Sequence, residues 1–190
     1  VYRSFNGHIS EASNSALELA TGDFVTFLDH DDELNKTALY EVVKTINDFQ
    51  DANLIYSDED KIDAKGRRYD PYFKSDWNKD LLYSQNYINH LAVYRTSLVK
   101  KIGGLRKGFE GSQDHDLILR YFEQMDEKTI LHIPKILYHW RAVEGSTALS
   151  SRAKNYATQA DVKALNAHFK RTSQKAAAEV IYSSQYRIKW

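Results

Sequence analysis

Two kinds of hydrophobic pattern run along this chain and predict helices alternating with short strands. Helices are predicted over residues 9–20, 35–49, 79–84, 96–102, 112–122 and 151–171, the longest of which carry apolar residues at helical spacing. Compact apolar runs predict strands over residues 24–28, 54–56, 91–94, 129–133 and 136–140, and short strands or a linker over 180–182 and 186–190. A turn is expected at 64–66 and a glycine-rich mobile loop at 103–111. This alternation indicates an α/β sandwich.

The apolar run at residues 24–28 stops at three carboxylates, Asp29, Asp31 and Asp32. Such a run is typical of a strand covered on both faces, as in a parallel sheet. Side chains alternate along a strand, so Asp29 and Asp31 are expected on one side. Two adjacent carboxylates repel, and a hard divalent cation would relieve that repulsion. Because ligands bind beyond the carboxyl ends of strands in open α/β sheets, this pattern predicts a metal site, with Asp32 as an acidic turn or cap.

A second acidic group follows the short strand at residues 54–56. It comprises Asp58, Glu59 and Asp60, and it lacks the clear alternation of the first group. A charged loop is the favoured interpretation here.

Three further residues are candidates for chemistry. Asp114 starts a helix beyond the glycine-rich loop, where the helix dipole favours an ionised carboxylate that could accept a proton from a substrate hydroxyl. Ordinary charge placement at a helix start is the alternative, and it is preferred for Asp116. His139 ends an apolar strand and is either structural or a ligand for metal or phosphate. Arg141 either neutralises a diphosphate or forms a surface ion pair.

Composition narrows the class of protein. The chain has 190 residues, a formal net charge of zero and no cysteine. One domain with a sizeable core fits this length, and the dispersed, balanced charge argues against nucleic acid as a partner. Disulfides and cysteine-held zinc are excluded. No apolar stretch is long enough to span a bilayer and no signal-peptide pattern occurs. Sugar rings stack on aromatic side chains, but the 13 tyrosines alone do not establish such a site.

Several motifs, taken in order, resemble a known family. Asn14 on its helix and residues 20–32, with the sequence ATGDFVTFLDHDD, resemble the centre of a family 2 glycosyltransferase of GT-A fold. Residues 71–77 and 86–88 are similar to segments of bacterial rhamnosyltransferase, O-antigen or capsule members. Residues 111–117 match the later acidic motif, and residues 137–141 and 145–147 match the closing segment. The resemblance covers roughly residues 6–150. The chain itself begins with Val1 and not with methionine, which suggests a fragment.

The resemblance implies an α/β, GT-A (Rossmann-like) glycosyltransferase domain that binds a nucleotide sugar. Asp29, Asp31 and His139 would hold Mn²⁺ or Mg²⁺ against the diphosphate of a UDP- or dTDP-sugar, with Asp31 as the preferred direct ligand. Asn14 and Arg141 would also contact this donor.

On the acceptor side, the resemblance assigns Asp114 as the general base that deprotonates an acceptor hydroxyl in a single inverting displacement. The acceptor would be a glycan or lipid-linked molecule in bacterial surface polysaccharide synthesis. The expected location is the cytoplasm, at the inner face of the cell membrane.

Two departures from the family pattern matter. Gln113 stands where the family usually has Glu before the base, and Asp114 is retained. The family's opening strands, which grip the nucleoside, have no counterpart in residues 1–7. We therefore expect a domain truncated at its N-terminus, weak nucleotide binding, and self-association through an unsatisfied sheet edge.

The expected organisation has three parts. Residues 1–150 form the partial GT-A domain, residues 151–172 a C-terminal helix packing on it, and residues 173–190 a linker or short strands. Residues 186–190 resemble the linker that leads into a second glycosyltransferase domain in tandem family members. The competing hypothesis is a non-catalytic binding module that retains only the acceptor half. An aspartate-phosphorylating protein is disfavoured, because Asp32 and Glu33 stand where the phosphatase pattern has Gly-Thr.

Overall fold

A computed structural model describes the protein over residues 6–142, 151–182 and 184–190, and over the side chains of all of these except 151–155. Helices and strands alternate along the chain, as predicted. In order they are α1 (His8–Leu19), β1 (Phe24–Thr26), β2 (Glu33–Leu34), α2 (Ala38–Asp48), β3 (Leu54–Ile62), β4 (Arg68–Tyr72), α3 (Lys79–Ser84), β5 (Ala92–Arg95), α4 (Thr96–Lys101), α5 (Gln113–Phe122), the 3₁₀ helix η1 (Glu127–Thr129), β6 (Ile130–Arg141), α6 (Ser151–Arg171), β7 (Ala177–Tyr182) and β8 (Gln185–Lys189).

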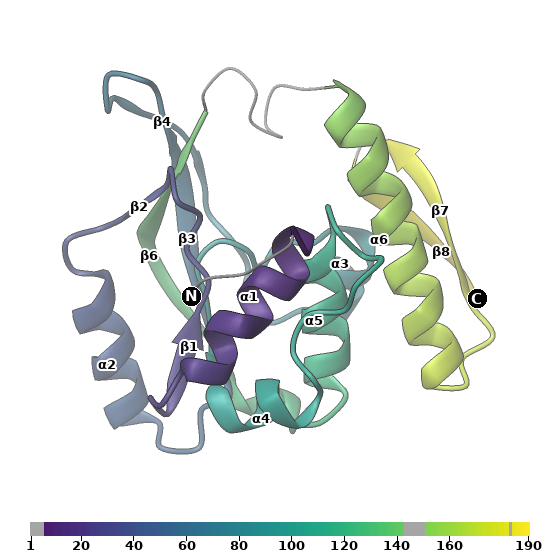
Figure 1. The fold of residues 1–190 in the computed structure, drawn as a ribbon, viewed down its shortest axis with the longest axis horizontal. Coiled ribbons are helices and arrows are strands. Elements are labelled where there is room, and N and C mark those ends of the chain that lie inside the picture. Colours follow the sequence, from purple (N-terminus) through teal and green to yellow (C-terminus); the bar gives the residue numbers. More distant parts are fainter. Residues whose placement is uncertain (1–5, 143–150, 183) are drawn as a thin grey trace.

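A six-stranded sheet forms the centre of the molecule, in the order β1-β5-β3-β6-β2 with β4 paired to β3 (Figure 1). Strand β5 is antiparallel to both β1 and β3, whereas β3 and β6 are parallel. Strands β1, β3 and β6 therefore point the same way, and their carboxyl ends meet at one end of the sheet. Ligand sites of open α/β sheets form at such an end.

Helices cover both faces of this sheet (Figure 1). On one face, Ala38 and Val42 of α2 pack with Ile55 of β3 in a small core. On the other face, Leu117 of α5 and Leu165 of α6 belong to a larger core shared with α1 and α3. The sheet is thus a rigid wall that positions the residues at its carboxyl end.

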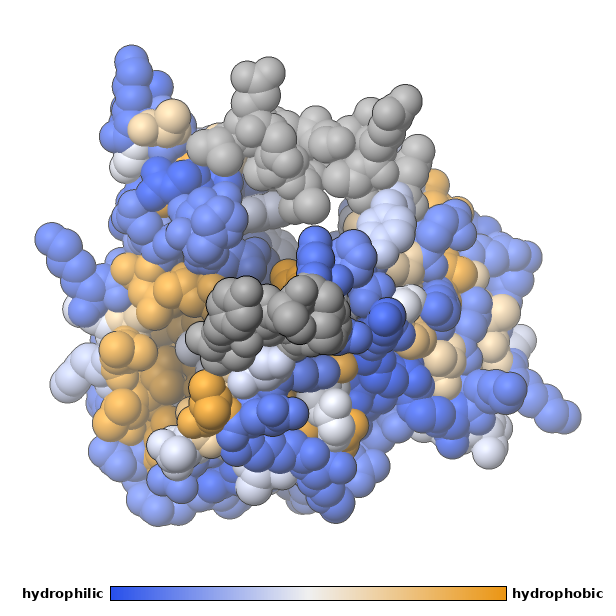
Figure 2. Space-filling model, viewed as in Figure 1, coloured by the Kyte–Doolittle hydropathy of each residue, from blue (hydrophilic) through white to orange (hydrophobic). Residues whose placement is uncertain are grey.

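Strand β1 differs from the expected buried, parallel strand. It spans only Phe24–Thr26, pairs antiparallel with β5 at the edge of the sheet and is half-buried. Leu28 follows the strand and is 48% exposed. Helix α2 also carries exposed apolar residues, Leu39 and Val43, and Figure 2 shows a hydrophobic patch on the left of the view, where α2 lies. The apolar run therefore belongs to an edge strand, and the prediction of a strand buried on both faces was wrong.

Strands β3 and β6 are longer than predicted, because they pair in parallel along their whole length. Strand β3 continues through the acidic residues that were expected to form a charged loop, and Asp58 and Asp60 are buried within it. Each finds a histidine on β6: His132 Nε2 lies 2.9 Å from Asp58, and His139 Nδ1 lies 2.5 Å from Asp60. Strand β6 is one strand where two were predicted, with its irregularity absorbed by register shifts at Asp58.

The C-terminal part of the chain packs beside α5. Helix α6 lies against α5, and the antiparallel β7–β8 hairpin lies on the outer side of α6 (Figure 1). Asp161 of α6 accepts hydrogen bonds from the Ser112 hydroxyl, from His115 at 2.9 Å and from the Tyr186 hydroxyl at 2.5 Å. Ser112 occupies the N-cap position of α5, and its hydroxyl binds Asp161 in place of a capping hydrogen bond. Across the described residues, every helix is too short or too polar to cross a membrane.

Candidate active site

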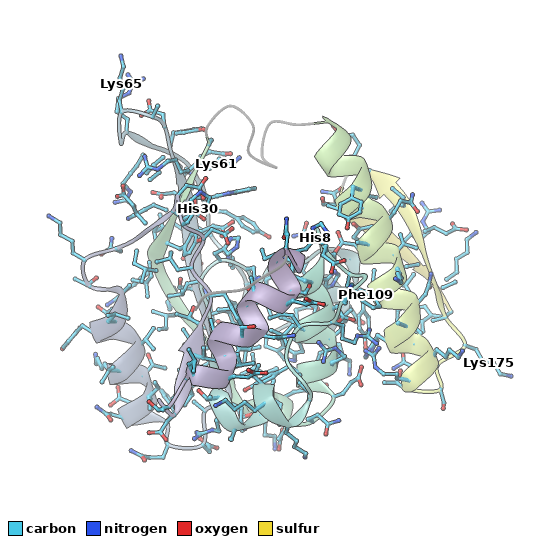
Figure 3. The ribbon with its side chains drawn as sticks, in the orientation of Figure 1. His8, His30, Lys61, Lys65, Phe109 and Lys175 are labelled. Atoms are coloured by element: carbon cyan, nitrogen blue, oxygen red, sulfur yellow. The ribbon has the colours of Figure 1, made fainter. Side chains whose placement is uncertain are left out.

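Two adjoining cavities open at the carboxyl end of β1, β3 and β6. The larger cavity, of about 620 Å³, is bounded by β3, β4, β6, the loop before β5, the start of α5, and α6. The smaller cavity, of about 450 Å³, lies between α1, β1 and β5. Asp29, His90 and Asp114 line both cavities. Figure 3 shows His30 and Lys61 on the sheet side of this region and His8 at the start of α1. Two predicted acids, Asp29 and Asp114, thus meet at the junction of the cavities.

Asp114 lies in the first turn of α5 and is held by two side-chain amides. Asn86 Nδ2 donates to Oδ2 of Asp114 at 2.9 Å, and Asn89 Nδ2 donates to the same oxygen at 3.0 Å. Both asparagines belong to the loop between α3 and β5, so the carboxylate is fixed between two elements of the core. A half-buried carboxylate that faces a cavity in this way can accept a proton from a hydroxyl group.

Residues 29–32 form a turn and not the end of an extended strand. The Asp32 N–H donates to the Asp29 carbonyl at 3.2 Å. The alternation that was expected to place Asp29 and Asp31 on one side therefore does not apply. Asp29 is exposed at the cavities, whereas Asp31 is half-buried, lies 3.6 Å from His30 Nδ1 and is not among the lining residues.

Asp32 closes this turn, in line with the acidic turn expected there, and its side chain is buried. Its carboxylate accepts hydrogen bonds from the Tyr138 hydroxyl and, at 2.8 Å, from the Arg141 N–H. Burial raises the pKa of Asp32, and these two hydrogen bonds only partly oppose the rise. The Arg141 guanidinium donates to the Asp31 carbonyl at 2.6 Å and pairs with Glu33. Arg141 thus holds the turn and does not line either cavity.

His139 and Asn14, also predicted to bind the donor or metal, have protein partners away from both cavities. His139 pairs with Asp60, which also accepts a hydrogen bond from Arg68 Nε at 2.6 Å. Asn14 binds the backbone of Leu105 twice, donating to its carbonyl at 2.7 Å and accepting from its N–H at 2.8 Å. These contacts fasten β3 to β6 and α1 to the loop after α4. The structure therefore brings two of the six predicted site residues together at the cavities.

A charged cluster beside the larger cavity was missed by sequence reasoning. The buried Lys74 donates to the His90 carbonyl at 2.5 Å, and its Nζ lies 3.6 Å from Glu59. Burial lowers the pKa of Lys74 to about 8, although the Glu59 charge opposes this. Burial also disfavours protonated His90, but the hydrogen bond and charge of Glu59, with the charges of Asp114 and Asp29, outweigh it and raise the pKa of His90. In the sequence, only the family resemblance of residues 71–77 and 86–88 pointed to the segment of Lys74 and to the loop before β5 that carries His90.

The carboxylates of the turn are candidate ligands for a divalent cation. No group of three or more histidine, aspartate or glutamate side chains in the described ranges is arranged to hold a metal ion. Asp29 and Asp31 do offer hard oxygen donors at the open end of the sheet. Mg²⁺ is commonly bound by one or two carboxylates, with substrate phosphates and water as the other ligands. Asp29, which lines both cavities, could supply one such carboxylate beside a phosphate-bearing ligand.

Comparison with known proteins decides the family. The sequence model of the family described as Glycosyl transferase family 2 matches residues 1–103, more than half of the 190-residue chain. The chain belongs to glycosyl transferase family 2. The relationship suggested by the motifs around Asp29 and Asp114 is thereby confirmed, and Asp29 lies within the matched residues.

Two curated relatives are much longer proteins. The chain is 50% identical over 192 residues to the uncharacterized protein y4gI of Sinorhizobium fredii, covering 100% of this chain and 21% of that protein. It is 41% identical over 189 residues to the O-antigen biosynthesis protein RfbC of Myxococcus xanthus, covering 98% of this chain and 14% of that protein. The chain thus spans about a fifth or less of the length of these two curated relatives.

A solved structure supports the fold. The crystal structure of S. aureus TarS 1-349 matches with a TM-score of 0.56 and 21% identity, over 86% of this chain and 52% of that chain. At this identity the likeness concerns the fold alone. Together with the family match, it confirms the predicted α/β domain of GT-A type.

Proposed function

We propose that this chain carries the catalytic centre of a metal-dependent, inverting glycosyltransferase. It moves a sugar from a nucleotide-sugar donor to a glycan or lipid-linked acceptor. Membership of family 2 supports transfer of a sugar as the class of reaction. The 41% identity to an O-antigen biosynthesis protein supports bacterial surface polysaccharide synthesis as its setting. The location proposed with it is the cytoplasmic side of the membrane.

One observation carries the proposal: Asp29 and Asp114 come from distant parts of the chain and line the same two cavities. Asp29 follows β1, and Asp114 is held at the start of α5 by Asn86 and Asn89. A displacement at a sugar needs a group that receives the acceptor proton and a group that receives the leaving diphosphate. Two carboxylates with different supports, facing one space, suit these two tasks.

The chemistry assigned to Asp114 is general base catalysis. An acceptor hydroxyl that donates a hydrogen bond to Asp114 attacks the anomeric carbon of the donor sugar. The new oxygen–carbon bond forms as the bond from that carbon to the diphosphate oxygen breaks, and its electron pair leaves with the nucleoside diphosphate. The hydroxyl proton passes to the Asp114 carboxylate. Attack from the side opposite the leaving group inverts the anomeric configuration.

The turn of residues 29–32 is assigned to the diphosphate. Asp29 and Asp31 would hold Mn²⁺ or Mg²⁺, and a bound ion supplies Lewis-acid stabilisation of the charge on the leaving diphosphate. Arg141 keeps the turn in place through the Asp31 carbonyl and through its own N–H to Asp32. His139 pairs with Asp60 and Asn14 binds the backbone of Leu105, so both stabilise the fold around the site and are assigned no ligand contact.

The deciding experiment measures sugar transfer by the full-length parent protein and by its Asp114→Asn variant. We expect turnover to fall by about 10²–10⁴-fold, the usual contribution of a general base, while donor binding persists. Asp80→Asn is a matched control, because Asp80 is an exposed carboxylate in the first turn of α3. It should leave turnover unchanged.

Two results would contradict the proposal in different ways. Unchanged turnover in Asp114→Asn would remove Asp114 as the base. Binding of donor and acceptor without transfer by the wild-type parent would instead favour the non-catalytic module. Asp29→Asn tests the diphosphate assignment, because it should weaken binding of UDP or dTDP in the presence of Mn²⁺ and leave metal-free binding unaltered.

A further inference from the structure

The buried carboxylate of Asp161, on α6, holds the start of α5 on both sides of the predicted base. Its Oδ1 atom accepts a hydrogen bond from the Ser112 hydroxyl and lies 2.9 Å from His115 Nδ1. In the sequence, Ser112 and His115 flank Gln113 and Asp114. One oxygen atom of α6 thus fixes both ends of the short segment that carries Asp114.

Further contacts connect this network to two other elements. Asp161 Oδ2 accepts a hydrogen bond from the Tyr186 hydroxyl of β8 at 2.5 Å. On its other side, His115 Nε2 lies 3.0 Å from the Leu82 carbonyl of α3. Asp161, His115 and Tyr186 are all buried. Because hydrogen bonds to an ionised group are stronger than those between neutral groups, the network ties α3, α6 and β8 firmly to the first turn of α5.

Helix α6 also contacts the loop that leads into α5. Lys163 Nζ donates to the Gly108 carbonyl at 2.6 Å and lies 4.4 Å from the centre of the Phe109 ring, which Figure 3 labels beside α6. At Gly111, a Cβ atom would lie only 2.8 Å from Cδ1 of Tyr156. The loop is therefore supported by α6 at several residues before Asp114.

Ser112 indicates that this network serves the position of α5. It occupies the N-cap, where a serine hydroxyl ordinarily accepts a hydrogen bond from an N–H of the first turn. Here the Ser112 side chain makes no capping hydrogen bond and binds Asp161. The stabilisation that a cap would give is forgone, and the start of the helix is joined to α6 instead.

We propose that Asp161, together with Ser112 and Tyr186, positions the Asp114 carboxylate for the proton transfer. Asp161 borders the larger cavity, but both of its carboxylate oxygens are engaged within the protein, so it acts through Asp114 and not on the substrate. The two asparagine amides orient the Asp114 side chain, whereas the Asp161 network fixes the backbone from which that side chain projects. A displacement of about 1 Å at a reacting group can cost about 10²-fold in rate.

This inference rests on the proposed function for the role of Asp114, and it extends the site along the chain. The family match ends at residue 103, and the three positioning residues lie beyond it. Helix α6 and the β7–β8 hairpin then belong to the unit that performs the reaction, although a linker or short strands were expected over residues 173–190.

The first test needs no substrate. The side-chain amides of Asn86 and Asn89 donate to Asp114, so their NMR signals in the ¹⁵N-labelled chain report where its carboxylate lies. Ser112→Ala removes the hydroxyl that binds Asp161 and no capping hydrogen bond, and Tyr186→Phe removes the hydroxyl on the other carboxylate oxygen. We expect both variants to shift the two amide signals.

Tyr121→Phe is the matched control. Tyr121 is buried near the other end of α5, and its hydroxyl donates to the Asn53 carbonyl at 2.7 Å. This variant also loses one buried hydroxyl from the same core, but it leaves the Asp161 network intact. The amide signals of Asn86 and Asn89 should therefore stay in place.

The second test is turnover by the full-length parent protein, at a temperature at which circular dichroism shows each variant to be folded. Asp161→Asn should lower kcat by about 10²-fold and Tyr186→Phe by about tenfold, while KM for the donor is unchanged. Tyr121→Phe should keep the kcat of the wild type. If Asp161→Asn does not fold, Tyr186→Phe and Ser112→Ala decide the question.

The two tests separate this inference from the proposed function. Amide signals that stay in place in both Ser112→Ala and Tyr186→Phe would overturn the positioning role, as would a fall in kcat that Tyr121→Phe matches. A parent protein that needs Asp114 for transfer but keeps full kcat in Tyr186→Phe and Ser112→Ala would retain the function and lose the positioning role. Shifted amide signals in a chain whose parent transfers nothing would retain the positioning of Asp114 and lose the function.

Discussion

Asn86 donates an amide hydrogen bond to Oδ2 of Asp114 across 2.9 Å, and this single contact joins the loop before β5 to the first turn of α5. Asn89 adds a second amide to the same oxygen at 3.0 Å. The orientation of the predicted base therefore depends on a loop that is 25 to 28 residues away in sequence. Substitutions in this loop should act on the reaction through Asp114.

Asn86→Asp tests this coupling with nearly no change in shape. The variant places a second carboxylate beside Asp114, and like charges disfavour ionisation of the pair. We expect turnover near neutral pH to fall by about tenfold or more, and to recover in part as the pH rises. The measurement is the pH profile of kcat for the full-length parent.

Asn78→Asp is the control for this substitution. Asn78 caps α3 by accepting a hydrogen bond from Leu81, and aspartate caps helices equally well. Its pH profile should match that of the wild type. A profile of Asn86→Asp that falls evenly at all pH values would show that misplacement, and not charge, causes the loss.

His115 gives the protein a stability that depends on pH. Its ring nitrogens lie 2.9 Å from Asp161 and 3.0 Å from the Leu82 carbonyl, and both partners are acceptors. Two acceptors require two N–H donors, so the buried ring is a cation. Burial alone would lower the pKa of His115, but Asp161 raises it above its ordinary value of 6.5. Burial alone would raise the pKa of Asp161, but His115 and the hydroxyls of Ser112 and Tyr186 hold it below 3.8.

The signs of these two shifts define the pH window. The raised pKa of His115 contributes stability that is full below pH 6.5 and is lost as the pH rises through the folded-state pKa. The lowered pKa of Asp161 contributes stability that is full above pH 3.8 and is lost as the pH falls through its folded-state value. The pair therefore stabilises the fold most between about pH 4 and pH 6.5.

His115→Gln should lower the free energy of unfolding by about 3 kcal/mol inside this window, because it leaves Asp161 without its charged partner. The difference from the wild type should shrink above the window. Urea unfolding at a series of pH values measures both curves. Tyr186→Phe serves as a comparison, with a loss of about 2 kcal/mol from one hydrogen bond to a charged group and no change in the alkaline limb. A difference independent of pH would contradict a charged His115.

Local patterns were enough to predict the α/β alternation and the place of Asp29 and Asp114. Helical spacing and a strand-ending acid are properties of neighbouring residues. The same reasoning failed for Asp58 and Asp60, because their burial depends on histidines that β6 brings from more than 70 residues away. A charged residue in a sequence carries no sign of such a partner.

His90 and Trp140 show the same limit at the site. Neither belongs to a spacing pattern, and each reaches the cavities only because β5 and β6 lie on either side of β3. Arg141 was expected either to neutralise a diphosphate or to form a surface ion pair, and it pairs with the carboxylate of Glu33 and donates to the carbonyl of Asp31. The sequence indicated that Arg141 lies near the acidic turn, but it could not indicate which groups its side chain contacts.

The free edge of β1 keeps the expectation of self-association open to a direct test. Within the described residues, β1 pairs with β5 on one side only, and Leu28, which follows β1, is 48% exposed. We expect the chain to form dimers or larger species with rising concentration, since unpaired edges attract other strands. Leu28→Lys should weaken this, whereas Val180→Lys on β7 should not. A monomer at all concentrations by light scattering would refute the expectation.

Gly103 and Gly104 separate backbone strain from steric conflict at the anchor of α1. Both have positive φ, +80° and +63°. A Cβ on Gly103 would meet nothing within 4 Å, whereas a Cβ on Gly104 would lie 2.3 Å from Asn14 Oδ1. That oxygen is the atom that accepts the Leu105 N–H. The two glycines thus share a conformational cost on substitution and differ in their contact with Asn14.

Gly103→Ala should lower the free energy of unfolding by about 1–2 kcal/mol, the cost of a left-handed conformation for a residue with a Cβ. Gly104→Ala should cost more by about 1 kcal/mol or more, because Asn14 must also give up its bond to Leu105. In the background Asn14→Ala the side-chain oxygen is gone and Leu17 Cδ2, 3.2 Å from the new Cβ, remains, so the extra cost of Gly104→Ala should shrink. Chemical unfolding of the wild type, the three single variants and the two double variants with Asn14→Ala measures these differences. Equal costs in the wild-type background would show that Asn14 moves freely, and its assignment as a scaffold residue would then fall.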